Sequence, residues 1–108
     1  MKKIIELTKK NFKKIINNNK IFIVVFGSQG TPKTTNTLKT LDGLDTDIKI
    51  GFVNIEQERE LMRDYVVRIT PTLIVFLDGF PDNVLNGKKL TARVNTIKEK
   101  ENISCLMN

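Results

Sequence analysis

The chain lacks histidine, has a single cysteine and contains no hydrophobic run long enough to span a membrane. Without histidine, a Cys–His nucleophile and an imidazole metal site are impossible. One cysteine, Cys105, cannot form a disulfide within the chain, so a disulfide framework is excluded. Only Ile4 and Ile5 stand between the N-terminal basic residues and Glu6, which is too short a run for the core of a signal peptide. We therefore expect a cytoplasmic protein with no membrane contact, no bound metal and no cofactor.

Length and composition indicate one domain over residues 1–108. A chain of 108 residues with 40% hydrophobic content can build a single core. The net charge is +6, and seven of the 18 basic residues fall within the first 20, a pattern that favours nucleic acid or acidic partners. Because no aromatic residues interleave with these lysines, we interpret them as a solvated face and do not expect nucleic-acid binding.

Apolar periodicity and turn residues predict an alternation of strands and helices. The expected strands are residues 3–7, 21–26, 48–54, 72–77 and 84–85. The first expected helix is capped by Thr8 and runs through Ile16, and the others are residues 34–44, 56–67 and 90–97. Their order, β-α-β-α-β-α-β-β-α, predicts an α/β domain in which helices cover both faces of a mixed sheet. Residues 103–108 are expected to form a short tail.

An uninterrupted apolar run, residues 73–77, lies within the stretch R-I-T-P-T-L-I-V-F-L-D-G at residues 68–79. β-branched and aromatic residues in a run this short favour a buried strand. Pro71 is tolerated at the first edge of that strand because no ladder donor is needed there, and Thr70 before it is biased towards extended geometry. The stretch therefore predicts a bend that leads into an interior strand.

The same stretch, together with Tyr65–Val67 before it, resembles the segment of thioredoxins in which a helix ends, a proline follows and a central strand begins. Residues 54–57, N-I-E-Q, resemble the family's N-I-D-Q at the same spacing from the proline, and Gly87 matches a late glycine of the family. The resemblance covers nearly the whole chain. It implies the thioredoxin fold, a central mixed sheet of four to five strands flanked by about four helices, and a cis peptide bond before Pro71.

The loop after the second expected strand lacks the family's Cys-Gly-Pro-Cys dithiol. With the prolines matched, Gly30-Thr31-Pro32-Lys33 replaces it, and with the strand aligned without a gap, Thr31-Pro32-Lys33-Thr34 does. Neither alignment supplies a sulfur, and thiol–disulfide exchange needs two. The family's buried Asp and Lys, which assist proton transfer, correspond to Val25 and Phe52. The resemblance therefore implies a domain without redox chemistry and without catalytic residues.

We interpret the chain as a monomeric, non-catalytic domain that binds a protein or an extended peptide. In the thioredoxin family the residue before the cis-proline holds extended substrate backbone, and Thr70 occupies that position here. The resemblance implies a contact surface made by the former dithiol loop and the proline loop: Gly30, Thr31, Pro32, Lys33, Thr34, Thr70 and Pro71. Alternatively, these residues only close the fold. The sequence does not identify the partner.

Three other functions are open from the sequence. The chain could act as an atypical thiol-redox protein of the thioredoxin family through Cys105 alone. Residues 27–34, G-S-Q-G-T-P-K-T, are one letter from the phosphate-binding G-x-x-x-x-G-K-[ST], but Pro32 has no N–H where the glycine donor belongs, and residues 50–54 end in Asn rather than in a Walker-B Asp. The chain could also be a divergent subunit of a larger complex.

Overall fold

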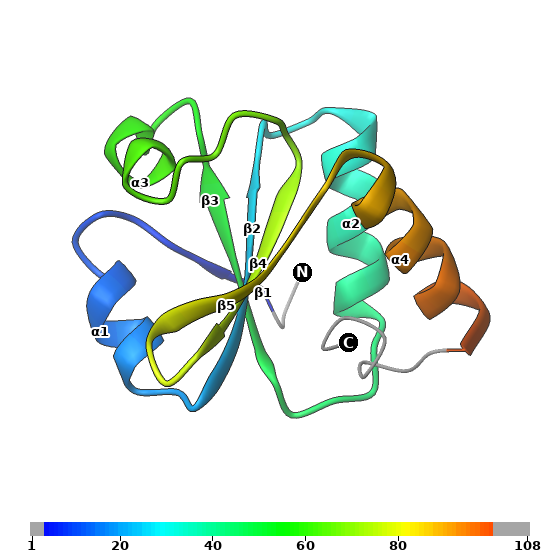
Figure 1. Cartoon of the computed structure of the whole chain (residues 1–108), viewed down its shortest axis with the longest axis horizontal. Coiled ribbons are helices and arrows are strands. Elements are labelled where there is room, and N and C mark those ends of the chain that lie inside the picture. The colour runs from blue at the N-terminus through cyan, green and yellow to red at the C-terminus, as the bar shows by residue number, and fades with distance from the viewer. Residues whose placement is uncertain (1–3, 101–108) are drawn as a thin grey trace.

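Strands and helices alternate along the chain as far as the fourth strand, which a fifth strand follows directly (Figure 1). The computed structural model describes residues 4–100. Its strands are β1 (Ile4–Glu6), β2 (Ile21–Gly27), β3 (Lys49–Asn54), β4 (Thr72–Leu77) and β5 (Phe80–Asn86). Its helices are α1 (Phe12–Asn17), α2 (Pro32–Asp42), α3 (Arg59–Asp64) and α4 (Gly87–Lys100). This order confirms the one predicted from the sequence.

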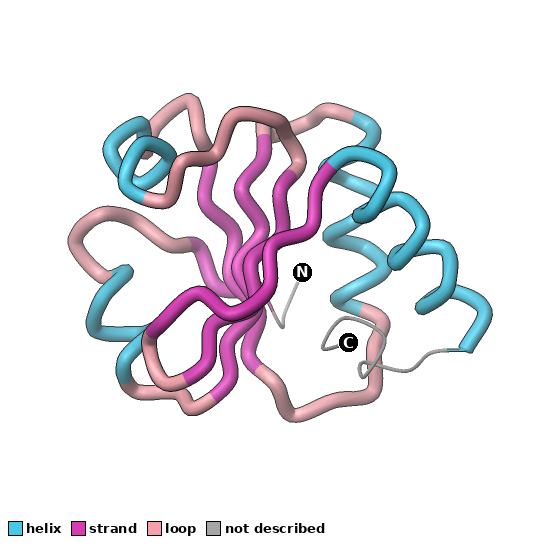
Figure 2. Tube along the Cα trace, viewed as in Figure 1, coloured by secondary structure: helices cyan, strands magenta, loops and turns pink. Residues whose placement is uncertain are grey.

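The five strands form one mixed sheet in the order β1-β3-β2-β4-β5 (Figure 2). β1, β3 and β2 are parallel, whereas β4 runs antiparallel to β2 and to β5. Helices α1 and α3 cover one face of the sheet, and α2 and α4 cover the other (Figure 1). The predicted α/β architecture, a mixed sheet of four to five strands with four helices, is therefore confirmed.

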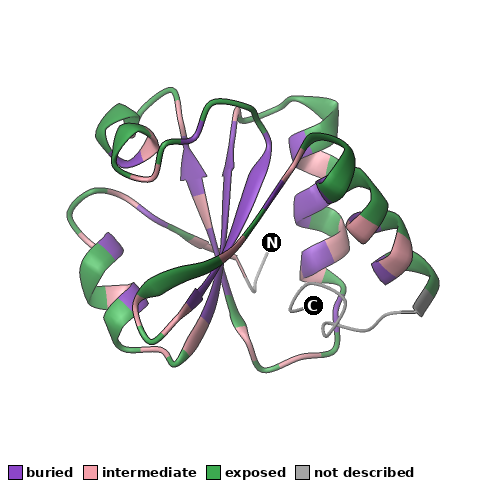
Figure 3. Cartoon of the chain, viewed as in Figure 1, coloured by how far each residue is buried: buried purple, intermediate pink, exposed green. Residues whose placement is uncertain are grey.

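The hydrophobic core has two layers, one on each face of the sheet. Successive side chains of a strand point to opposite faces. Phe22, Val24 and Phe26 of β2 accordingly pack in the layer beneath α1 and α3, whereas Ile23 and Val25 pack in the layer beneath α2 and α4. Figure 3 shows the central strands as buried and the outer faces of the helices as exposed. Burial on both faces explains why the central strands are continuous apolar runs.

Two helices are shorter than the sequence predicts. Thr8 does not cap α1, because the side chain of Asn11 accepts a hydrogen bond from the Thr8 N–H and closes a turn before the helix begins at Phe12. Helix α3 begins at Arg59 rather than near residue 56, because the carbonyl of Asn54 accepts hydrogen bonds from the N–H groups of Gln57 and Glu58 in a preceding turn. In both places, a turn precedes the helix, so the helix begins later than the sequence pattern predicts.

Strand β5 is longer than the predicted residues 84–85. It begins at Phe80, immediately after a tight turn in which Asp78 and Gly79 have φ values of 51° and 87°. Positive φ at both central residues is the geometry that two-residue hairpins require. Pro81 lies within the strand, where an edge position and a register shift in β4 accommodate its missing N–H. None of the helices within residues 4–100 is long and apolar enough to cross a membrane.

Candidate functional site

The two loops that the sequence singles out lie at the same end of the sheet. β2 and β4 are antiparallel neighbours, and Phe26 near the end of β2 pairs with Thr72 at the start of β4. The chain that leaves β2 and the chain that enters β4 therefore run beside each other. This pairing brings the loop at residues 28–31 and the start of α2 close to the loop at residues 69–71.

Side-chain hydrogen bonds tie the loop after β2 to its surroundings. The hydroxyl of Ser28 donates to the carboxylate of Glu56 at 2.9 Å, and the hydroxyl of Thr31 donates to the carbonyl of Ser28 at 3.0 Å. The side chain of Asn54, at the end of β3, donates to Gln29 at 3.3 Å. Gly30 adopts a φ of 87°, a left-handed conformation that glycine adopts without steric penalty. The loop is therefore a defined turn held by Asn54 at the end of β3 and by Glu56 just after it.

Helix α2 begins immediately after this turn. Thr31 has extended backbone angles, φ −74° and ψ 142°, and its carbonyl accepts the first helical hydrogen bond, from the N–H of Thr35. Pro32 occupies the first helical position, where its missing N–H would have had no helical partner. Lys33 follows and is exposed to solvent. With the prolines matched, Lys33 takes the position of the family's second cysteine, so the helix start then carries a cation in place of a thiol.

Thr34 differs from the contact residue expected from the sequence, because it is only 1% exposed. Its side chain packs so closely against Gly27 that a Cβ on Gly27 would lie 2.7 Å from it. Its hydroxyl has no hydrogen-bond partner among the described residues. In a phosphate loop, this hydroxyl would bind Mg²⁺. Its burial, together with an amide rather than a carboxylate at Asn54, gives the nucleotide-binding hypothesis no geometric support.

The loop before β4 presents an exposed backbone edge. The peptide bond between Thr70 and Pro71 is cis. Thr70 is exposed, and no hydrogen bond to another described residue engages its backbone N–H or C=O. Ile69 beside it is 52% exposed, although its carbonyl accepts a hydrogen bond from the hydroxyl of Thr72. The Thr70 backbone is therefore free to pair with an extended chain.

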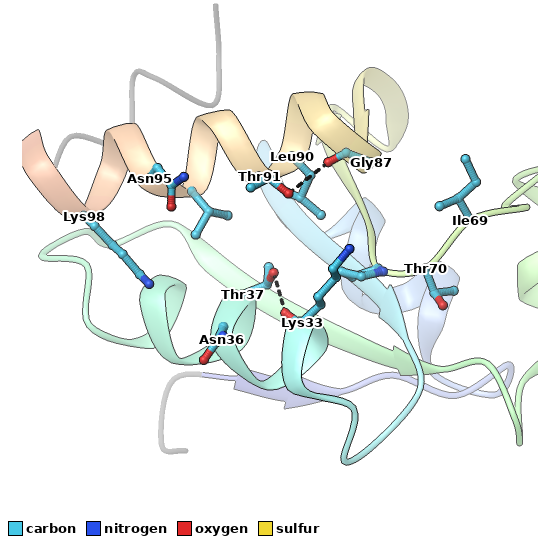
Figure 4. A pocket seen from close by; sticks show the side chains of 12 residues that line it. Lys33, Asn36, Thr37, Ile69, Thr70, Gly87, Leu90, Thr91, Asn95 and Lys98 are labelled. Atoms are coloured by element: carbon cyan, nitrogen blue, oxygen red, sulfur yellow. Dashed lines mark hydrogen bonds between the residues drawn. The ribbon is translucent and has the colours of Figure 1, made fainter.

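A groove of about 190 Å³ opens beside Thr70, between α2 and α4 (Figure 4). The proline loop and α2 contribute Ile69, Thr70, Pro71, Lys33, Asn36 and Thr37. Helix α4 contributes Gly87, Leu90, Thr91, Val94, Asn95 and Lys98. We call this concavity the α2–α4 groove. It has an apolar floor, polar walls and a lysine from each helix.

The structure brings together only some of the site residues predicted from the sequence. Lys33, Thr70 and Pro71 line the α2–α4 groove. Gly30 and Thr34 instead line a smaller pocket of about 180 Å³ that also includes residues of β1 and β3. Neither pocket includes Thr31 or Pro32.

Sequence reasoning missed the contribution of α4 to the groove. The sequence predicts only a helix over residues 90–97, and Lys98 lies outside that range. The spacing of Leu90, Val94 and Ile97 indicates a buried helical stripe but not the helix that it meets. The match of Gly87 to a late glycine of the thioredoxin family was the one available signal, since Gly87 begins α4 and lines the groove.

One titratable group among the described residues has a clearly shifted pKa. Burial raises the pKa of Tyr65 above its ordinary value of 10.0, and the negative charge of Asp64 adds to the rise. The ring of Tyr65 lies among Phe12, Phe26 and Phe76, with centroids 5.2 to 6.1 Å away. Tyr65 therefore belongs to the core beneath α1 and α3 rather than to the α2–α4 groove. No cluster of three or more metal-ligating side chains occurs within residues 4–100.

The sequence of the chain is similar to those of known proteins. The family profile described as thioredoxin matches residues 3–99. Protein disulfide-isomerase 1 of Caenorhabditis elegans is 27% identical over 104 residues, which cover 90% of this chain and 21% of that protein. The chain thus spans about a fifth of the length of this relative.

Two solved structures share the fold over almost their whole length. The thioredoxin of Fasciola hepatica is 25% identical, with 88% of this chain and 97% of that chain covered and a TM-score of 0.72. The oxidised thioredoxin of Plasmodium falciparum is 17% identical, with 92% and 99% covered and a TM-score of 0.74. These structures and the profile match show that the chain has the thioredoxin fold. The chain belongs to the thioredoxin family.

Proposed function

We propose that the chain is a non-catalytic binding domain that pairs an extended segment of a partner protein with the backbone of Thr70. The observation that carries the proposal is the exposed N–H and C=O of Thr70, which have no hydrogen-bond partner among the described residues. An extended peptide that adds to such an edge gains main-chain hydrogen bonds and needs no sulfur. The α2–α4 groove beside Thr70 would then receive side chains of the bound segment.

The absence of cysteine among the described residues supports binding without redox chemistry. Residues 27–34 contain no cysteine, and the chain's single thiol, Cys105, lies outside the described residues. Thiol–disulfide exchange requires an attacking thiolate and a resolving thiol. The similarity to a protein disulfide-isomerase supports a polypeptide as the ligand, since that relative acts on proteins by its name. A monomeric state and a cytoplasmic location remain parts of this proposal.

Peptide selection followed by NMR tests the proposal. A phage-displayed library of linear peptides is selected on the full chain, and a selected peptide is added to the ¹⁵N-labelled protein. We expect the largest chemical-shift changes at residues 69–71 and at Lys33, because these residues border the exposed backbone edge. Changes confined to the opposite face, around α1 and α3, would contradict the proposal. A pull-down is the second measurement, with the full chain as the bait. The chain with both Lys33 and Thr70 substituted is the control bait.

An insulin-reduction assay tests the alternative of atypical redox activity through Cys105. With a dithiol donor present, we expect no acceleration above the donor alone, because residues 27–34 supply no thiolate to attack the insulin disulfide. A Cys105→Ser variant is the control. Turnover that this substitution abolishes would establish redox function and displace the binding proposal.

A further inference from the structure

The α2–α4 groove extends well beyond the backbone edge at Thr70. One end lies against Thr70 and Gly87, and the far end lies at Lys98 on α4 (Figure 4). Gly87 and Lys98 are separated by about 16 Å along the helix, from the rise of an α-helix. About five residues of extended peptide span this distance. A peptide held at Thr70 is therefore long enough to reach Lys98 if it continues along the groove.

The groove is lined by cations and by no carboxylate. Lys33 and Lys98 line the groove, and Lys88 lines a shallower concavity that shares Lys33 and Gly87 with it. Among the described residues that line these two concavities, none is Asp or Glu. No ion pair with another residue in the described part of the chain involves Lys33, Lys88 or Lys98. Three positively charged side chains thus border a surface that also has apolar and amide groups.

Concave surfaces of one sign concentrate oppositely charged ligands. A cleft with low-dielectric walls focuses the field of its charges and favours a complementary partner. Leu90 and Val94 make the floor apolar, whereas Asn36 and Asn95 supply amide donors and acceptors at the walls. These features suit a peptide with carboxylates along its length better than they suit a neutral or basic one.

We propose that the α2–α4 groove binds an acidic stretch of the partner polypeptide, which extends over about five residues from the residue that pairs with Thr70. This inference rests on the proposed function, because the peptide must first be held at Thr70. It adds a selectivity for acidic segments that backbone pairing alone does not provide. Lys33, Lys88 and Lys98 would contact the carboxylates.

Two probe peptides separate this inference from the proposed function. Both contain the same linear segment selected for binding at Thr70, and one continues into a run of glutamates whereas the other continues into a run of glutamines. Fluorescence anisotropy gives the affinity of each for the full chain. At low ionic strength we expect the glutamate peptide to bind about tenfold more tightly, and we expect added salt to remove the difference.

Charge reversal then assigns the effect to the groove. Lys98→Glu is expected to weaken the glutamate peptide about fivefold and to change the affinity of the glutamine peptide much less. Lys39→Glu makes the same change in net charge at an exposed position of α2 that lines neither concavity, so it is expected to have a much smaller effect. Lys98→Arg, which keeps the charge, is expected to retain the preference for glutamates.

Each of four outcomes would contradict a different part of the two proposals. Equal affinity for both peptides, with chemical-shift changes still at Thr70, overturns the acidic selectivity and leaves the proposed function intact. Failure of both peptides to perturb Thr70 overturns both proposals. Equal weakening by Lys98→Glu and Lys39→Glu assigns the preference to overall charge and overturns the role of the groove. A single-stranded oligonucleotide that binds the groove more tightly than the glutamate peptide overturns the choice of a polypeptide ligand.

Discussion

Val25 and Phe52 are partners across the parallel β2–β3 ladder, and both pack in the core layer beneath α2 and α4. The thioredoxin resemblance places a buried acid and a buried base at these two positions. Here the pair is hydrocarbon, and Val25 is completely buried. A core without this ion pair avoids the desolvation of two charges but offers no proton-transfer group to the loop above it. The apolar side chains at Val25 and Phe52 and the absence of the dithiol from residues 27–34 both support the proposed non-catalytic role.

Restoring the acid alone is expected to destabilise the domain severely. Val25→Asp would bury a carboxylate without a partner, and we expect the free energy of unfolding to fall by about 3–5 kcal/mol in urea denaturation. Val25→Ala, which removes volume without adding charge, is the control for the cavity. Adding Phe52→Lys to Val25→Asp is expected to recover part of the loss, because the pair is then restored. A loss below about 1 kcal/mol for Val25→Asp alone would contradict the complete burial of Val25.

Thr34→Val is expected to stabilise the protein. The Thr34 hydroxyl is buried without a hydrogen-bond partner among the described residues, and valine has nearly the same shape. Removing an unsatisfied buried hydroxyl should raise the free energy of unfolding by about 1 kcal/mol. Thr37→Val on the same helix is the matched control, because the Thr37 hydroxyl donates to the Lys33 carbonyl at 2.9 Å and should show no gain. Destabilisation by Thr34→Val would mean that its hydroxyl has a partner in solution.

Val66→Gly is expected to stabilise the protein at the end of α3. Val66 has a φ of 54°, a left-handed conformation that β-branched residues rarely adopt, and its side chain is 67% exposed. Glycine removes the steric penalty, and we expect a gain of about 1 kcal/mol in thermal or urea unfolding. Val84→Gly, at an exposed strand position, should instead destabilise by about 0.5–1 kcal/mol. The same sign of change for both variants would refute this account of strain at Val66.

The pKa of Tyr65 makes stability depend on pH in the alkaline range. Its pKa is raised in the folded state by burial and by Asp64, so the unfolded chain releases the phenolic proton at lower pH than the folded chain does. The resulting stabilisation is complete below the unfolded pKa near 10 and is lost as the pH rises through the folded pKa. Tyr65 is the only tyrosine and the chain has no tryptophan, so tyrosinate absorbance reports this group alone.

An absorbance titration of the folded chain, with the same chain in urea as the reference, measures the two transitions. We expect the folded transition at higher pH, and a smaller displacement in Asp64→Asn. Coincident transitions would show that Tyr65 is solvated in the folded protein.

The sequence predicted the sheet well because the information needed is local. Residues 73–77 form an apolar run that is stable only when both faces are covered, and the turn at Asp78 and Gly79 ends it. The proline loop was also recognisable, since Pro71 stands immediately before that run. Helix boundaries were less predictable, because the side chains of Asn11 and Asn54 accept hydrogen bonds from nearby backbone N–H groups in turns before the helices. Such hydrogen bonds depend on side-chain geometry that periodicity does not reveal.

The candidate site was predictable only in part, because it combines residues from distant parts of the chain. Thr70 and Lys33 follow from the resemblance, whereas Lys98 becomes relevant only when α4 is seen to lie beside α2 on the same face of the sheet (Figure 1). No local sequence pattern predicts that these two helices are neighbours. Thr34, by contrast, is expected in the site from the sequence but is buried. Pro32 sets the first residue of α2 and thereby turns Thr34 inward against Gly27. Its residue type gives no sign of that orientation.

The most direct test of peptide pairing is hydrogen exchange at the backbone amide of Thr70 in the complex with a selected peptide. If the peptide backbone accepts a hydrogen bond from this N–H, the Thr70 amide exchanges much more slowly in the complex than in the free chain, while the amide of Gly30 on the neighbouring loop changes less. A Thr70 amide that exchanges equally fast with and without saturating peptide would contradict the central claim that this exposed edge is where the domain holds its partner.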